Sequence, residues 1–215
     1  MHRNRPSFPT GAALALVLAL TAVVPVARAD GPRFEVTPFG AYRVGGEFET
    51  QETPSTTIDL EDGSGWGLDL GLYRDGSSFY ELLYATESAE FDTSDPAVAG
   101  VEVTTEYYQF GGTLLFADEQ WYVPYLSLTA GATRFSADGG YGSDTKFSMS
   151  LGGGLRLPFT DNLSATMGLR GYLTFVDSDS DFLCVSGGEQ SSCLVKSTGS
   201  TYFQGEASLG LTVRF

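Results

Sequence analysis

The chain ends in Tyr202–Phe215 (YFQGEASLGLTVRF), and the pattern of this segment indicates how the whole protein folds. Its side chains alternate. One set is Phe203, Gly205, Ala207, Leu209, Leu211, Val213 and Phe215, and the other is Tyr202, Gln204, Glu206, Ser208, Gly210, Thr212 and Arg214. Because successive side chains of a β-strand point to opposite faces, this period of two predicts a strand with one apolar and one polar face.

The same alternation recurs upstream at 34–48, 66–73, 80–87, 107–116, 126–133, 146–157 and 163–175. Short turns at 74–77, 117–120 and 158–162 alternate with long loops at about 49–63, 92–101, 136–144 and 177–200. Amphipathic strands joined in this way are typical of an outer-membrane barrel. The sequence therefore predicts an all-β fold, an eight-stranded antiparallel up-and-down transmembrane β-barrel with periplasmic N- and C-termini.

The polar faces of these strands carry charges that the fold places inside the barrel. They are Glu35, Arg43, Glu47, Asp69, Glu81, Glu87, Arg156, Arg170, Glu206 and Arg214. The interior of an eight-stranded barrel is just wide enough for side chains, so opposite charges can pair there while the apolar faces meet lipid. We expect a lumen ion network of Arg43, Asp69, Arg156, Arg170, Glu206 and Arg214. Arg170 and Glu206, on neighbouring strands, are expected at its centre, with Arg43 across the closing seam.

Aromatic residues gather near the predicted strand ends, as expected for a barrel that crosses two membrane interfaces. One girdle would contain Phe34, Phe79, Tyr80, Phe116, Trp121, Tyr122, Phe159 and Phe215, and the other Phe48, Trp66, Phe91, Phe135, Phe147, Phe175 and Phe203. A water-soluble periplasmic barrel is the alternative. It would require a partner to cover the outward leucines and aromatic residues.

The N-terminus has the three parts of a secretory signal peptide. MHRNRPSFPT is basic, GAALALVLALTAVV is apolar, and Ala27-Arg28-Ala29 is a small-x-small cleavage site. The apolar run is shorter than the ~20 residues of a spanning helix, which disfavours a membrane anchor. We expect residues 1–29 to be removed and residues 30–215 to form the barrel domain.

The chain is strongly acidic, with 12 Lys+Arg against 27 Asp+Glu and a net charge of −15. Removal of residues 1–29 takes away three arginines and leaves −18, which disfavours binding to nucleic acid. The long loops hold 13 acidic residues and only Lys196 as a cation. Asp177, Asp179 and Asp181 could offer oxygen ligands to a divalent cation. The favoured interpretation is a solvated acidic surface, so no metal site and no cofactor is predicted.

Cys184 and Cys193 flank eight residues that include Gly187-Gly188. In an exported protein such a pair favours a disulfide that closes a small loop. Metal binding by the two thiolates is the alternative, but no His or further Cys is present to complete a tetrahedral site.

The signal peptide, the eight strands and the terminal SLGLTVRF resemble the small outer-membrane β-barrel proteins of Gram-negative bacteria, the OmpA/OmpX/OmpW-like group. The resemblance implies a location in the outer membrane, in contact with its lipid and lipopolysaccharide. It also implies assembly by the barrel-assembly machinery with the help of periplasmic chaperones. Leu209, Leu211, Val213 and Phe215 would then form the C-terminal assembly signal.

The only histidine is His2, inside the predicted signal peptide. Enzymes of the outer-membrane barrel type rely on a histidine, so the mature chain is predicted to be non-enzymatic. A paired-carboxylate reaction inside the lumen is formally open, but a structural ion network is favoured. We expect a role in envelope integrity or surface interaction, through loops on a rigid scaffold. The alternative is a small pore or a conduit for small or apolar solutes, as the OmpW-like part of the resemblance implies.

Overall fold

The computed structural model describes residues 33–45, 47–49, 57–60, 62–92, 102–116, 121–137, 143–176, 181–184, 193–196 and 201–215. The predicted signal peptide and its cleavage site lie outside these residues, as do Asp177 and Asp179. The signal peptide, its cleavage site and the role of these two aspartates therefore stay predictions. In the part of the chain described here, no helix is long and apolar enough to cross a membrane.

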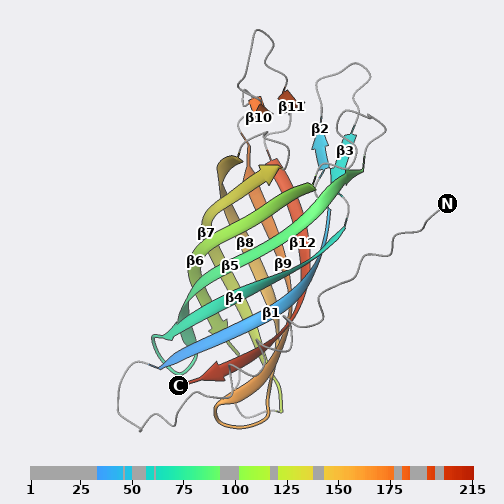
Figure 1. Ribbon diagram of the computed structural model, residues 1–215. Coiled ribbons are helices and arrows are strands. Elements are labelled where there is room, and N and C mark those ends of the chain that lie inside the picture. Colours follow the sequence, from blue (N-terminus) through green and yellow to red (C-terminus); the bar gives the residue numbers. More distant parts are fainter. Residues whose placement is uncertain are drawn as a thin grey trace, which may run out of the picture. The chain divides into compact units, whose positions relative to one another are not determined.

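Eight long antiparallel strands form the fold (Figure 1). They are β1 (Phe34–Val44), β4 (Gly63–Tyr73), β5 (Ser78–Asp92), β6 (Glu102–Leu115), β7 (Val123–Ala137), β8 (Ser143–Pro158), β9 (Leu163–Phe175) and β12 (Thr201–Arg214). Their order is β5-β4-β1-β12-β9-β8-β7-β6, and a further pairing of β5 with β6 closes the ring. The predicted closed barrel is confirmed.

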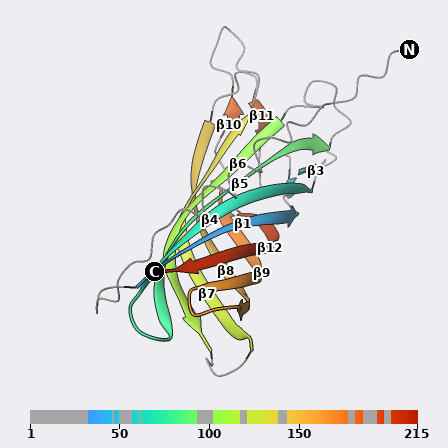
Figure 2. The ribbon, with the colours of Figure 1, turned by 60° about the horizontal axis from the view of Figure 1, so that its bottom comes forward.

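The beginning of β1 and the end of β12 meet at one end of the barrel, where the amide of Phe215 donates a hydrogen bond to the carbonyl of Phe34 (2.8 Å). The β4–β5 and β8–β9 turns lie at this same end (Figure 2), called here the turn end; the opposite end, where β1 ends, is called the loop end. The predicted periplasmic orientation of the turn end is not tested by this arrangement and stays a prediction.

Four short strands accompany the eight long ones, and three of them, β3, β10 and β11, lie within the predicted long loops. β2 (Glu47–Glu49) pairs with β3 (Thr57–Leu60), which pairs with the end of β5. The first predicted strand, 34–48, is in fact divided between β1 and β2. Gly45, which lies between them, has a φ of +84°, a conformation that glycine adopts at little cost. β10 (Asp181–Cys184) and β11 (Cys193–Lys196) pair with each other as a hairpin.

The predicted alternation of short and long connections is wrong at one place. Only residues 138–142 separate β7 from β8, whereas 116–122 separate β6 from β7. β7 and β8 continue past the end of their apolar face, where Arg134, Ser136, Ser143 and Thr145 follow. The sequence pattern that marks a strand fades there because these outward residues are polar, while the inward face carries Phe135.

The wall of the barrel is apolar on the outside and polar on the inside. Leu169 and Leu209 are 70% and 68% exposed, whereas Arg43, Glu81 and Thr133 are completely buried. This distribution is the reverse of a water-soluble barrel and suits a wall that faces lipid. Among the girdle residues whose side chains the structure describes, Phe79 and Phe135 contradict the prediction, because they point into the barrel and are buried.

Candidate functional site

The lumen is the candidate site, and its first layer at the turn end is built around Glu35. The guanidinium of Arg156 donates two hydrogen bonds to this carboxylate, at 2.7 and 2.8 Å. The hydroxyl of Tyr73 donates to Glu35 Oε2 (2.6 Å) and accepts from Arg214 Nη2 (2.7 Å). Arg214 Nε lies 4.0 Å from Glu35 Oε2. Charge-assisted paired bonds of this kind fix both groups in one geometry.

The second layer crosses the full width of the barrel. Arg170 on β9 pairs with Glu81 on β5 at 2.6 Å, and these strands lie on opposite sides of the ring. Glu81 Oε2 also accepts hydrogen bonds from the hydroxyls of Thr113 and Ser127. Arg170 Nη1 donates to the hydroxyl of Ser150 (3.0 Å). Every strand from β5 to β9 on this side of the ring therefore contributes to the layer.

The third layer surrounds Arg43, which is completely buried. Its Nη2 lies 2.7 Å from Glu206 Oε2, and its Nη1 lies 3.6 Å from Glu87 Oε2. The guanidinium also lies over the rings of Tyr107 and Tyr172, at 5.4 and 5.7 Å from their centroids. Two carboxylates and two aromatic faces thus stabilise one buried cation.

A fourth, mainly apolar layer closes the lumen toward the loop end, and sequence reasoning missed it. Its members are Ala89, Val103, Phe135, Val176 and Tyr202, all buried. The rings of Phe135 and Tyr202 meet edge to face at 5.4 Å. The alternation of side chains already places these residues on the inward face, but the girdle prediction puts Phe135 on the outside of the barrel.

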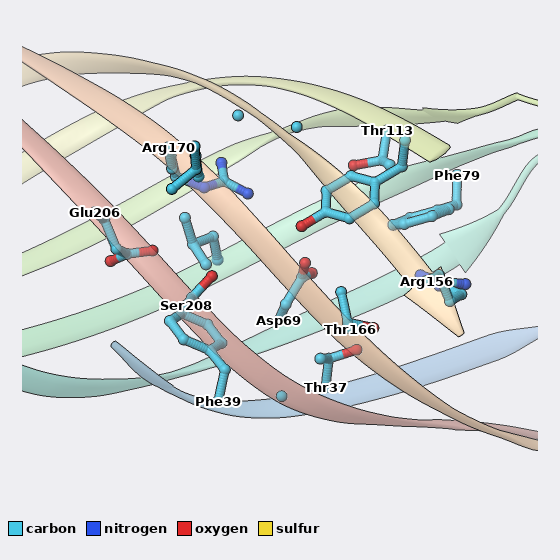
Figure 3. Close-up of a pocket in the computed structure, with 16 residues that line it drawn as sticks. Thr37, Phe39, Asp69, Phe79, Thr113, Arg156, Thr166, Arg170, Glu206 and Ser208 are labelled. Carbon is cyan, nitrogen blue, oxygen red and sulfur yellow. The ribbon is translucent and has the colours of Figure 1, made fainter. Parts of the chain in front are cut away.

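Glycines inside the barrel make room for these large groups. A Cβ at Gly67 would lie 2.2 Å from the ring of Phe39, and one at Gly168 would lie 2.2 Å from the hydroxyl of Tyr125. The lumen is therefore packed by side chains. Within the described residues it holds a cavity of about 40 Å³ (Figure 3), lined among others by Thr37, Asp69 and Arg170.

The structure places all six residues of the expected ion network inside the barrel, and Arg43 meets Glu206 across the β1–β12 seam as predicted, but the partner of Arg170 differs. Arg170 and Glu206 are opposite each other in the β9–β12 register, yet they do not pair. Arg170 instead reaches Glu81 across the lumen, while Glu206 pairs with Arg43. Within the described residues, no arginine or lysine nitrogen forms an ion pair with Asp69. The side chain of Glu47 lies outside the described residues.

The structure describes the remaining predicted site residues only in part. Leu209, Leu211, Val213 and Phe215 belong to or follow β12 and face outward, and their role as an assembly signal stays a prediction. Cys184 and Cys193 are opposite each other in the β10–β11 register. Their side chains are not among those that the structure describes, so the disulfide stays a prediction. In the described part of the chain, no group of three His, Cys, Asp or Glu residues could hold a metal ion.

A closed barrel with an apolar wall and a polar, packed lumen defines the class of protein. No water is available in the bilayer core to satisfy backbone groups, so only helices and closed barrels span membranes. This chain forms a transmembrane β-barrel of the outer-membrane type, and the predicted fold and transmembrane strands are confirmed.

Solved structures with this fold include three small outer-membrane proteins. Neisserial surface protein A has a TM-score of 0.55 and 15% identity, over 85% of this chain and 97% of its own. OprG from Pseudomonas aeruginosa has a TM-score of 0.55 and 10% identity, over 86% and 96%. Outer membrane protein AlkL has a TM-score of 0.52 and 12% identity, over 100% and 97%. At these identities the likeness establishes the fold alone. No protein-family model and no curated protein sequence matches the chain.

Proposed function

We propose that this protein is a non-enzymatic, integral outer-membrane barrel of a Gram-negative bacterium that acts through its loops, in envelope integrity or surface interaction. The observation that carries the proposal is the packed lumen. Ion pairs lie inside it at three levels, and two of them, Arg156–Glu35 and Arg170–Glu81, join strands that are not neighbours; an apolar layer closes it toward the loop end. A barrel filled in this way is a rigid scaffold, and recognition is normally placed on the loops of such a scaffold.

The proposal includes a mature chain that starts after residue 29, with periplasmic termini and with lipid, lipopolysaccharide, the barrel-assembly machinery and periplasmic chaperones as partners. Acidic loops would then face outward, where divalent cations can bridge them to lipopolysaccharide phosphates. One relative in fold, Neisserial surface protein A, is named for a location on the cell surface, which agrees with this role.

The proposal also includes the disulfide between Cys184 and Cys193. These residues face each other across the β10–β11 hairpin, and disulfides form between cysteines whose backbones lie close together. The link would hold the longest predicted loop in a hairpin. Reduction is expected to change the gel migration of the unfolded chain and leave the folded barrel intact.

A non-enzymatic role is supported by the state of the lumen carboxylates. Glu35, Glu81 and Glu206 each accept hydrogen bonds from an arginine and from a hydroxyl. A general acid or base must reach a substrate, and these groups are engaged by protein instead.

The test combines bilayer recordings with a cell assay. The protein purified from outer membranes should give no reproducible openings in planar bilayers while it migrates as a folded barrel on unheated gels. Cells that lack the gene should take up a hydrophobic dye faster. The wild type should restore the barrier, and a variant with the three aspartates of 177–181 replaced by asparagine should restore it less well. Discrete openings from folded wild-type barrel, or full rescue by the asparagine variant, would contradict the proposal.

A small gated pore is the second candidate function, favoured by the position of Arg43 between two carboxylates, Glu206 and Glu87. Movement of the guanidinium from one to the other would rearrange the lumen without leaving it unpaired. If the pore is correct, Glu206→Gln and Arg170→Gln should each change conductance. A conductance trace that neither substitution alters would remove the gating hypothesis.

A further inference from the structure

Asp69 on β4 is a half-buried lumen carboxylate that forms no ion pair with a described arginine or lysine. Its Oδ1 is buried and accepts no hydrogen bond from the described residues. In the same part of the chain, every other buried lumen carboxylate lies within 4 Å of an arginine. These carboxylates are Glu35, Glu81, Glu87 and Glu206.

The charges inside the described barrel do not balance. The inward carboxylates are Glu35, Asp69, Glu81, Glu87 and Glu206, and the inward arginines are Arg43, Arg156, Arg170 and Arg214. Lys146 and Asp144 pair with each other and add no net charge. The lumen is therefore one positive charge short, and Asp69 is the carboxylate that no arginine contacts. A buried charge without a counter-charge is strongly destabilising.

The cavity beside Asp69 has the size and the lining for a small ion. Its volume of about 40 Å³ exceeds the roughly 10–15 Å³ that one water-sized particle requires. Hydroxyl groups of Thr37, Thr166 and Ser208 line it, and Figure 3 shows the Asp69 carboxylate in its middle, between Arg170 and Arg156. A hydroxyl oxygen has two lone pairs, so it can coordinate a cation while it keeps a hydrogen bond.

We propose that Asp69 and this cavity bind one monovalent alkali cation, which completes the charge balance of the lumen. Of the two carboxylates that line the cavity, Glu206 is paired with Arg43, so Asp69 and the hydroxyl oxygens are left to bind a hard cation. A divalent ion is disfavoured because Arg156 and Arg170 line the same cavity and because the lumen lacks only one positive charge. The site is independent of the loops and of the barrel's orientation, so it goes beyond the proposed function.

The test is the dependence of barrel stability on the kind of cation. Unfolding of the protein purified from outer membranes in detergent is followed by the heat-modifiable gel shift in lithium, sodium, potassium and choline chloride at equal ionic strength. Choline is too large for the cavity. An alkali cation should raise the midpoint by about 3–6 °C for each tenfold increase above its dissociation constant. Asp69→Asn should abolish the difference, while Asp75→Asn, a change in an exposed turn carboxylate, should keep it.

Two further measurements keep the proposal testable if Asp69→Asn does not fold. Sodium NMR of the wild-type barrel should show line broadening that an excess of the preferred alkali ion reverses. Equal midpoints in all four salts would overturn the proposal, and so would an unchanged cation dependence in Asp69→Asn. An infrared band of a protonated carboxyl that persists in alkali salts and disappears in Asp69→Asn would also overturn it, because a proton would then neutralise the group.

Discussion

Replacement of Arg43 by methionine tests whether buried ion pairs hold the lumen together. Methionine has a similar length but no charge, so Glu206 and Glu87 lose the cation that lies 2.7 and 3.6 Å away. Removal of one partner of a buried pair costs about 3–5 kcal/mol, because the other charge is left uncompensated. The loss of contact with two tyrosine rings adds to this cost. Arg43→Met should therefore lower the free energy of unfolding by about 3–5 kcal/mol or more.

The assay is denaturant unfolding of the barrel in lipid vesicles, followed by tryptophan fluorescence. A matched control is Arg134→Met, because Arg134 lies on the outside of the barrel, with a half-exposed side chain 3.7 Å from Glu106. An exposed pair of this kind contributes about 0–1 kcal/mol. Adding Glu206→Gln to Arg43→Met should recover part of the loss, since one uncompensated carboxylate is removed. Equal effects of Arg43→Met and Arg134→Met would refute the reasoning.

Three other predictions follow from the packing, the wall and the turn end. Gly67→Ala should destabilise the barrel by about 1–3 kcal/mol because its Cβ would clash with the phenyl ring across from it, whereas Gly40→Ala, with nothing within 4 Å, should be neutral in the same unfolding assay. Leu209→Arg should cost up to about 2–4 kcal/mol in vesicles, since this residue faces lipid, and much less in detergent with a polar surface. Hydrogen bonds from the side chain of Ser78 and neighbouring groups lower the pKa of Asp75 from 3.8 to about 2. The stability that Asp75 contributes is therefore present above pH 4 and is lost as the pH falls through 2, and an NMR titration of its carboxyl should show this pKa.

The direction in which side chains point was predictable from the sequence. The inward positions of Arg43 and Glu81 and the outward position of Leu209 follow from the period of two, which the extended backbone imposes on any strand. The number and the order of the long strands were also predictable, because each amphipathic segment forms one strand that pairs with the next along the chain. The pattern failed at the adjoining ends of β7 and β8, where outward residues such as Arg134 and Ser143 are polar, and where an aromatic residue lies inside, as at Phe135.

The partners of the charged residues were decided by the tertiary structure. Strand order makes Arg170 and Glu206 neighbours, but the barrel is so narrow that a long side chain on β9 reaches Glu81 on the opposite wall. Such a contact depends on the closure, tilt and diameter of the ring, which no single segment encodes. The absence of an ion pair at Asp69 among the described residues also depends on the tertiary structure, because it follows from which carboxylates the arginines reach. By itself, the sequence determined which residues enter the lumen, and three-dimensional closure determined which of them meet.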